Sequence, residues 1–262
     1  IVAADIGTTI TVTVTATNGA GAVSATSAGY TLTYTQKVLA QVPIAYWPQA
    51  EAAGATVMLD ASGNGRNGAY KAATEPVKGS TGIGDGRTAA LYDGTNDYAN
   101  GFTASLAAAL PGTSGTVSFW FQVTNAGVWT DAATRVALRI SVNASNQVQF
   151  SKNSVSNRVD FNCTFNATSK NVAKTTFSPT TWQHIAITWK DLNNGDQMIA
   201  YLNGVQEGAT QTGNGAFTGT ITNVTSGASN TTPTSPWSGS IAHVAVWATA
   251  LSAAQIATIA TV

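Results

Sequence analysis

The chain has 262 residues and a formal net charge of zero, and only 9% of its residues are charged whereas 44% are hydrophobic. This balance lacks the basic patch that nucleic acids and anionic lipids require, and no apolar run is long enough to span a membrane. We therefore expect a well-packed core under a neutral polar surface, with neither a nucleic acid partner nor membrane insertion.

Residues 1–36 have the pattern of a β-hairpin. Ile10, Val12 and Val14 alternate with threonines over residues 10–15, and all of these residues are β-branched. This pattern predicts a strand with one apolar face. Asn18-Gly19-Ala20-Gly21 is a turn signal, and residues 23–34 are predicted to form the return strand.

An isolated two-stranded hairpin is marginal in water, so its apolar face has to be covered. The chain starts at Ile1 rather than at Met, and we expect strands of a longer protein to precede it and complete this domain. The alternative is that the hairpin adds to a sheet of the remaining chain or to a neighbouring subunit.

Residues 37–42 are predicted to be a linker, and residues 43–262 have the pattern of strands joined by turns. Val117, Phe119 and Phe121 lie on one face of a predicted strand, and Ser118, Trp120 and Gln122 lie on the other. The first face is predicted to point to the core. We therefore predict an all-β sandwich for this part of the chain.

Two short helices interrupt the strands. Residues 104–110 are rich in Ala and Leu and end before Pro111, and residues 252–259 begin with Ser252 as a predicted N-cap. The single cysteine, Cys163, lies in an alternating segment and is predicted to be a buried thiol.

Five segments, in chain order, resemble the laminin-G-like, concanavalin A-like (pentraxin-related) jelly-roll family. They are YWPQAEAAGATVMLDASGNGRNGAY from Tyr46, AALYDGTNDYA, GTVSFWFQV (115–123), TWQHIAITWKD…MIAYLNGVQ (181–206) and WSGSIAHVAVWATALSAAQI (237–256). The resemblance implies a jelly-roll sandwich over residues 43–262, and such modules mostly bind surfaces and sugars.

The N-terminal hairpin resembles the last two strands of a bacterial or phage immunoglobulin-like domain. The similar residues are a D-x-G motif at Asp5–Gly7 and V-T-A-T-N-x-x-G from Val14 to Gly21. This resemblance implies that residues 1–36 are the C-terminal strands of such a domain, followed by the linker and the jelly roll.

The sequence lacks the arrangements that hydrolases use. Glycosidases need two carboxyls facing each other, which glucanases of this architecture place in an E-x-D-x-x-E string that is missing here. Only Asp160 is predicted within a strand, and His184 and His243 are interpreted as hydrogen-bonded structural residues. We therefore predict no catalytic residues and no enzyme activity.

The resemblance leaves calcium as an open alternative, with no other cofactor implied. Many relatives bind calcium through carboxylates at loop ends, and the matching positions are Asp93 and Asp97, with Asp60 as a third candidate. The acidic pair that many relatives carry in the last core strand is replaced by Ala242 and His243. The alternative interpretation of Asp93 is an Asx-turn before a glycine.

Glycan binding needs an exposed aromatic ring and nearby hydrogen-bonding groups. Trp129 lies in the loop NAGVWTDAAT and has no position in the family pattern, so it is the predicted platform. Asn125 and Asp131, in the same loop, are the predicted hydrogen-bonding partners. The alternative is that Trp129 closes the edge of the sandwich.

The predicted function is that of a non-catalytic carbohydrate- or surface-binding module of a phage virion (tail, fibre or capsid-decorating) or of a secreted bacterial protein. Its expected location is the virion surface or the extracellular space. Its expected partners are cell-surface or extracellular glycans and neighbouring subunits. Because fold alone does not determine function, two alternatives stay open: a structural decoration domain without ligand, and an accessory domain of a larger glycanase.

Overall fold

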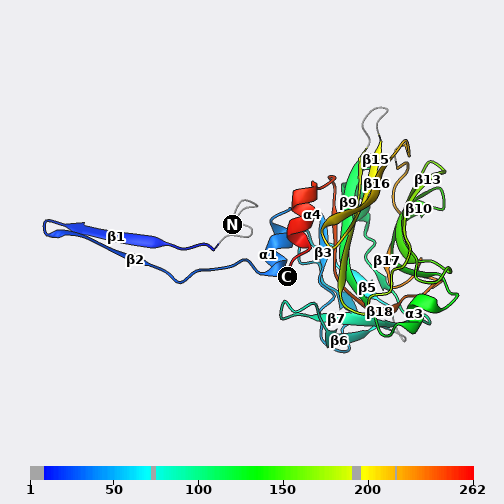
Figure 1. Ribbon diagram of the computed structural model, residues 1–262, viewed down its shortest axis with the longest axis horizontal. Helices are drawn as coiled ribbons and strands as arrows, with labels where there is room; N and C mark the ends of the chain where they lie inside the picture. The colour runs from blue at the N-terminus through cyan, green and yellow to red at the C-terminus, as the bar shows by residue number, and fades with distance from the viewer. Residues whose placement is uncertain (1–8, 72–74, 191–195, 216) are drawn as a thin grey trace.

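The computed structural model describes residues 9–71, 75–190, 196–215 and 217–262, which form a β-sandwich with a long hairpin arm (Figure 1). The Asp5–Gly7 motif lies outside the described residues. Two eight-stranded antiparallel sheets make up the sandwich, as predicted for a jelly roll.

The first sheet, here the β10 sheet, is built around the strand that follows the α3 loop. Its strands in spatial order are β13 (Thr168–Lys174), β12 (Val159–Phe165), β11 (Asn146–Lys152), β10 (Arg135–Asn143), β17 (Asn223–Ser226), β8 (Ala99–Asn100), β5 (Gly68–Tyr70) and β4 (Val57–Met58).

The second sheet, here the β9 sheet, carries the long central strands β9 and β18. Its strands in spatial order are β16 (Val205–Thr212), β15 (Gln197–Leu202), β14 (Gln183–Lys190), β9 (Ser114–Val123), β18 (Ser238–Trp247), β7 (Thr88–Asp93) and β6 (Val77–Thr81), and β3 (Ala45–Trp47) pairs with β18.

The main core lies between the two sheets. Val117, Phe119 and Phe121 of β9 are fully buried on the side that faces the β10 sheet, which confirms their predicted face. The rings of Phe119 and Phe121 lie 5.7 and 5.0 Å from that of Phe150 in β11. Each such side chain contributes about 1.5–3 kcal/mol by leaving water.

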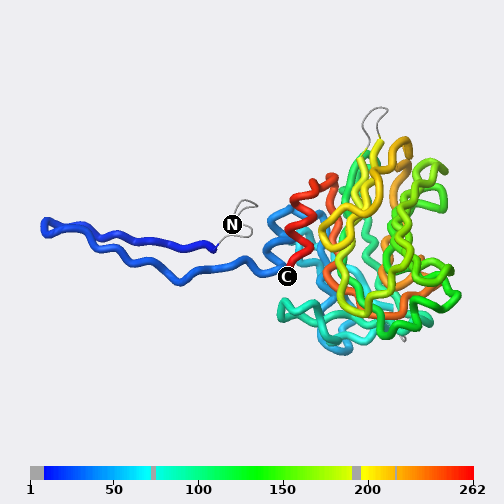
Figure 2. Tube along the Cα trace, in the orientation of Figure 1, coloured from blue at the N-terminus to red at the C-terminus, as the bar shows by residue number. Residues whose placement is uncertain are grey.

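A second cluster covers part of the outer face of the β9 sheet. Trp120, which points away from Phe119 and Phe121, packs there under the helices α1 (Tyr34–Leu39) and α4 (Ala253–Ile259). These helices, one before the first strand of the sandwich and one after its last strand, lie side by side (Figure 2). Tyr34 Oη accepts a hydrogen bond from Trp120 Nε1 at 2.8 Å. The helices therefore bury one part of this face and leave another part open.

Helix α1 occupies residues that we predicted as the end of a strand and the start of the linker at 37–42. Thr33 and Gln36 form a capping box that begins the helix. Val38 is buried in the outer cluster, and Gln41, also buried, accepts a hydrogen bond from Gln255 of α4 at 2.8 Å. Residues 37–41 are therefore packed against the sandwich instead of forming a linker, and only Val42 of this segment is exposed.

The other short helices agree with the sequence. The predicted helix at 104–110 is α2 (Ala104–Ala109), and Ser252 is the N-cap of α4 with a capping box to Gln255. Cys163 is fully buried in the main core, as predicted.

The hairpin arm consists of β1 (Thr13–Asn18) and β2 (Gly21–Thr26), which project away from the sandwich (Figure 1). The turn lies at the predicted place, with the Asn18 side chain accepting a hydrogen bond from the backbone N–H of Ala20 at 2.8 Å. The return strand ends at Thr26, earlier than predicted. Every residue of both strands is exposed.

Candidate functional site

Trp129 does not form an exposed platform, so this prediction is wrong. The short helix α3 (Gly127–Thr130) turns the indole inward, where it is fully buried and lies edge-on to Phe177 at 5.0 Å. Its Nε1–H donates to the carbonyl of Pro179 at 2.8 Å, so its polar atom is also satisfied. Trp129 closes the edge of the main core, the alternative that the sequence left open.

Asp131, in the same loop, forms ion pairs with two basic side chains. Its carboxylate contacts Arg135 at 2.9 Å and the fully buried ammonium of Lys152 at 2.7 Å. Burial opposes ionisation, but the hydrogen bonds from Lys152 and Arg135 outweigh it and hold the pKa of Asp131 below its usual value. The carboxylate is thus occupied within the protein.

Asn125 is the exposed member of the predicted glycan-binding set. Its Oδ1 accepts the backbone N–H of Gly127 at 2.9 Å, which shapes the turn into α3. The structure therefore separates the three residues: one ring is in the core, one carboxylate is ion-paired, and one amide is on the surface.

The three candidate calcium ligands do not converge. Asp93 Oδ1 accepts the backbone N–H of Thr95 at 2.7 Å, and Asp97 Oδ2 accepts that of Asp93 at 2.9 Å. Burial raises the pKa of Asp97. Asp60, in a different loop, accepts backbone N–H groups with both carboxylate oxygens.

A cation at any of these positions would have to displace backbone donors, so these residues do not fit a dedicated calcium site. Within the described residues, no three His, Cys, Asp or Glu side chains come together as a potential metal site. Asp93 forms the Asx-turn of the alternative interpretation.

The two histidines differ from each other. His243 Nδ1 lies 2.7 Å from Tyr46 Oη, and its Nε2 lies 3.2 Å from Asp85 Oδ2, so this ring is polar-paired as predicted. Burial lowers the pKa of His243, with Asp85 opposing that effect. The backbone of His243 is left-handed (φ 56°) at an irregularity in the β9–β18 pairing, which turns the ring toward the Asp85 loop.

His184 is buried against Trp120, with ring centroids 5.2 Å apart. Neither ring nitrogen has a hydrogen-bond partner among the residues that the structure describes, unlike the prediction. Burial lowers the pKa of His184 to about 3, so the ring is neutral at pH 7. Both histidines lie under the outer cluster, out of reach of a substrate.

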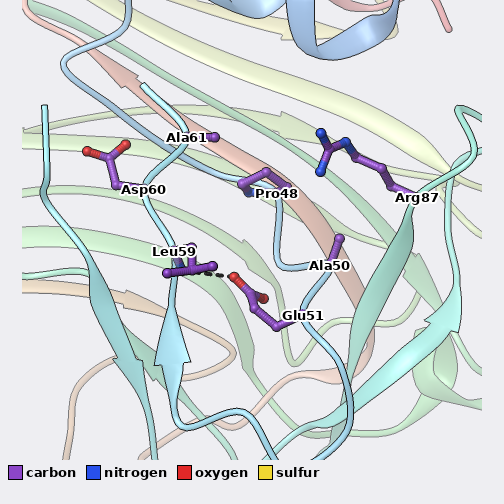
Figure 3. Close-up of a pocket in the computed structure, with 7 residues that line it drawn as sticks. All are labelled: Pro48, Ala50, Glu51, Leu59, Asp60, Ala61 and Arg87. Atoms are coloured by element: carbon purple, nitrogen blue, oxygen red, sulfur yellow. Dashed lines mark hydrogen bonds between the residues drawn. The ribbon is translucent and has the colours of Figure 1, made fainter. Parts of the chain in front are cut away.

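An apolar hollow of about 370 Å³ lies beside the β3–β4 connection (Figure 3). It is lined by Pro48, Ala50, Glu51, Leu59, Asp60, Ala61 and Arg87. Glu51 accepts hydrogen bonds from the Leu59 N–H at 2.8 Å and the Tyr70 hydroxyl at 2.6 Å, so its carboxylate supports the fold. This hollow offers no aromatic ring for a ligand.

A shallow groove of about 430 Å³ crosses the uncovered part of the outer face of the β9 sheet. The residues that line it are Thr81, Gly82, Leu91, Gln122, Val123, Thr124, Trp182 and Ser240. They combine one indole, two aliphatic side chains, one amide and three hydroxyls, with no ionisable group. This is the mixture that sugars require, because their C–H faces stack on rings and their hydroxyls pair with amides and hydroxyls.

Trp182 is the aromatic residue of this groove. All seven tryptophans lie within the described residues; six are at most 7% exposed, and only Trp182 is partly open to solvent. Its inner side packs on the outer cluster, which orients the ring. Gln122 is held in place beside it by a hydrogen bond from Nε2 to the Thr180 carbonyl at 2.6 Å.

Sequence reasoning missed Trp182, although the signal was present. Ile185 and Ile187 face the main core, so the alternation of this strand places positions 182, 184 and 186 on the other face. Trp182 lies in the segment TWQHIAITWKD that resembles the family, so it has the position in the family pattern that Trp129 lacks.

Comparison with known proteins identifies the architecture. A family model described as the concanavalin A-like lectin/glucanases superfamily (Laminin_G_3) matches residues 93–257. None of the curated proteins is a significant match to the sequence.

Solved structures share the fold at low sequence identity. Domain 4 of AbnA, a GH43 extracellular arabinanase from Geobacillus stearothermophilus solved with arabinotriose, is 18% identical with a TM-score of 0.57, over 84% of this chain and 98% of that one. The receptor-binding domain of botulinum neurotoxin mosaic serotype C/D is 12% identical with a TM-score of 0.61, over 85% and 51%.

Trypanosoma rangeli sialidase, solved with the inhibitor DANA, is 11% identical with a TM-score of 0.57, over 82% of this chain and 32% of the enzyme. This chain spans about half the length of the toxin receptor-binding domain. At these identities the similarity establishes the fold alone.

Proposed function

The chain belongs to the concanavalin A-like lectin/glucanase superfamily, and on this basis we propose that it is a non-catalytic carbohydrate-binding module whose ligand lies in the groove of the β9 sheet. The observation that carries the proposal is the position of Trp182. It is the one partly exposed indole of the chain, and it borders Gln122 and Ser240 in that groove.

In this proposal Trp182 stacks on the C–H face of one sugar unit. Stacking of this kind contributes about 0.5–1.5 kcal/mol beyond the buried area. Gln122 Oε1 and Ser240 Oγ have no hydrogen-bond partners among the described residues and are available to sugar hydroxyls. Because Trp182 and Gln122 are already held by their neighbours, little side-chain entropy is lost on binding.

The chemistry of the groove supports binding without catalysis. Glycoside hydrolysis requires an acid and a base or nucleophile, and none of the groove residues ionises near neutral pH. In the separate hollow of Figure 3, Glu51 and Asp60 are committed to hydrogen bonds that support the fold.

Two settings suit such a module. The similarity to one domain of an extracellular arabinanase supports an extracellular accessory domain of a larger glycanase. The uncharged, exposed arm at residues 9–30 supports attachment to neighbouring subunits, as in a phage virion or a secreted adhesive protein. In that second setting the arm is the C-terminal part of an immunoglobulin-like domain. No helix within the described residues is long and apolar enough to cross a membrane.

The test is binding of the chain to a panel of polysaccharides by affinity electrophoresis and calorimetry. Trp182→Ala should weaken binding about tenfold, while the melting temperature changes little because the ring is only partly buried. Tyr30→Ala is the matched control, since it removes an exposed aromatic ring of the arm and should leave the affinity unchanged. Equal binding by the wild type and Trp182→Ala would refute the groove as the site.

A further inference from the structure

We infer that the ligand of the groove is an uncharged saccharide chain of several units that lies across the strands of the β9 sheet. This inference rests on the proposed function and specifies its ligand class. Three features carry it: the register of the strands, the chemistry of the lining, and the distribution of apolar side chains.

The groove residues form a row from strand to strand. Gln122 of β9 lies opposite Ser240 of β18, which in turn lies opposite Leu91 of β7. Gln183 lies opposite Phe121, so Trp182 is the β14-side neighbour of Gln122. Thr81 of β6 also lines the groove but lies outside this row, because it pairs with Thr88 of β7 and not with Leu91.

From Trp182 to Leu91 this row crosses three interstrand steps, which corresponds to a length of about 14 Å at about 4.8 Å per step. One sugar ring spans about one such step. A ligand that fills the groove is therefore an oligosaccharide or a stretch within a longer chain, and not a single terminal sugar.

The lining excludes an acidic sugar. A uronic or sialic acid that entered the groove would lose water from its carboxylate without gaining a cationic partner, which is unfavourable. Asp85, in the loop that follows Gly82, is itself negative and pairs with His243. Arg87 of the same loop lines the separate hollow of Figure 3.

Apolar side chains flank the polar ones. Trp182 on one side and Leu91 on the other provide surfaces for the C–H faces of two different sugar units, and Gln122 and Ser240 lie between them. The two apolar contacts are made by separate units, so a disaccharide on Trp182 does not reach Leu91. The affinity should therefore depend on chain length.

The experiment is calorimetry with ladders of one to six units of neutral arabino-, xylo- and gluco-oligosaccharides and of acidic oligogalacturonides. The expected result is a rise of about tenfold or more in affinity from two to four units of a neutral series and a plateau beyond about four. Binding should change less than about twofold between about 0.05 and 0.5 M salt, and galacturonides should bind at least about tenfold more weakly.

Two variants locate the ends of the ligand. Trp182→Ala should weaken binding at every length, whereas Leu91→Ala should weaken binding of four units about threefold and leave two units unchanged. Binding that depends on Trp182 but is complete with one unit, or is stronger for galacturonides, would overturn this inference and keep the groove as the site. Binding that is indifferent to Trp182, or absent from all series, would overturn the proposed function itself.

Discussion

The arm and the sandwich of this chain are β-structures of opposite kinds. In the arm, every residue of β1 and β2 is exposed, and cross-strand pairs such as Thr13–Thr26 at 2.8 Å join side chains in water. In the sandwich, β9 is buried on its inner face by the β10 sheet, and α1 and α4 cover its outer face at Trp120. The arm follows local sequence signals, whereas the sandwich depends on contacts between distant segments.

This difference shows what an alternating pattern specifies. Val14 and Val23 lie on the same face of the arm yet remain 65% and 76% exposed, because nothing in the described chain packs on them. Val117 and Phe119 have a similar alternation and are fully buried. An apolar face is therefore necessary for burial but becomes a core only when another layer covers it.

The largest expected effect tests the burial of Trp129. Trp129→Ala should lower the free energy of unfolding by about 3–5 kcal/mol, because it leaves a cavity beside Phe121, Phe177 and Trp237. Urea unfolding followed by circular dichroism measures it. Trp182→Ala is the matched control, with an expected loss below about 1 kcal/mol. Similar losses for both variants would contradict the distinction between core and surface tryptophan.

The next effect concerns the ion pair between Asp131 and Lys152. Asp131→Asn leaves the fully buried Lys152 ammonium without its counterion, and we expect a loss of about 2–3 kcal/mol. The loss is smaller than for a fully buried pair because the Asp131 side chain is 30% exposed. Lys152→Met with Asp131→Asn should recover part of the stability, and no recovery in the double variant would contradict an electrostatic origin.

Acidification should weaken the sandwich through His184. Its pKa is lowered by burial from 6.5 to about 3, so between these values the unfolded chain binds a proton that the folded chain does not. The stabilisation is complete above pH 6.5 and falls by about 1.4 kcal/mol per pH unit as the pH decreases toward 3.

Urea midpoints measured from about pH 7 to about pH 5 check this sign. His184→Phe keeps an aromatic ring on Trp120 and should flatten the dependence. An unchanged slope in His184→Phe would show that other groups, such as His243, cause the acid sensitivity.

The smallest effect is expected in the arm. Val14→Thr should change the free energy of unfolding of the sandwich by less than about 0.5 kcal/mol, since the side chain packs on nothing in the described chain. Val117→Thr makes the same chemical change in β9 and should cost about 1–3 kcal/mol, because it buries a hydroxyl. Chemical unfolding of both variants gives the comparison, and a large effect of Val14→Thr would mean that the arm docks on the sandwich.

The candidate site was only partly predictable. The sequence indicated a sugar-binding module with an aromatic platform, and it placed that platform at Trp129 because this residue lies in a loop without a family position. A loop can fold inward as well as outward, and the turn of α3 directs this indole to the core. Trp182 becomes a surface residue because α1 and α4 stop short of it.

The sequence by itself determined the local features of this protein: the faces of β9, the turn at Asn18–Gly21, the N-cap at Ser252 and membership of the jelly-roll family. Each depends on residues a few positions apart or on a pattern along one strand, which the order of amino acids specifies directly. Only the tertiary structure decided that residues 37–41 pack as part of the sandwich and which tryptophan meets solvent. Burial depends on which segments lie next to each other after folding, and a position in the sequence does not state its neighbours in space.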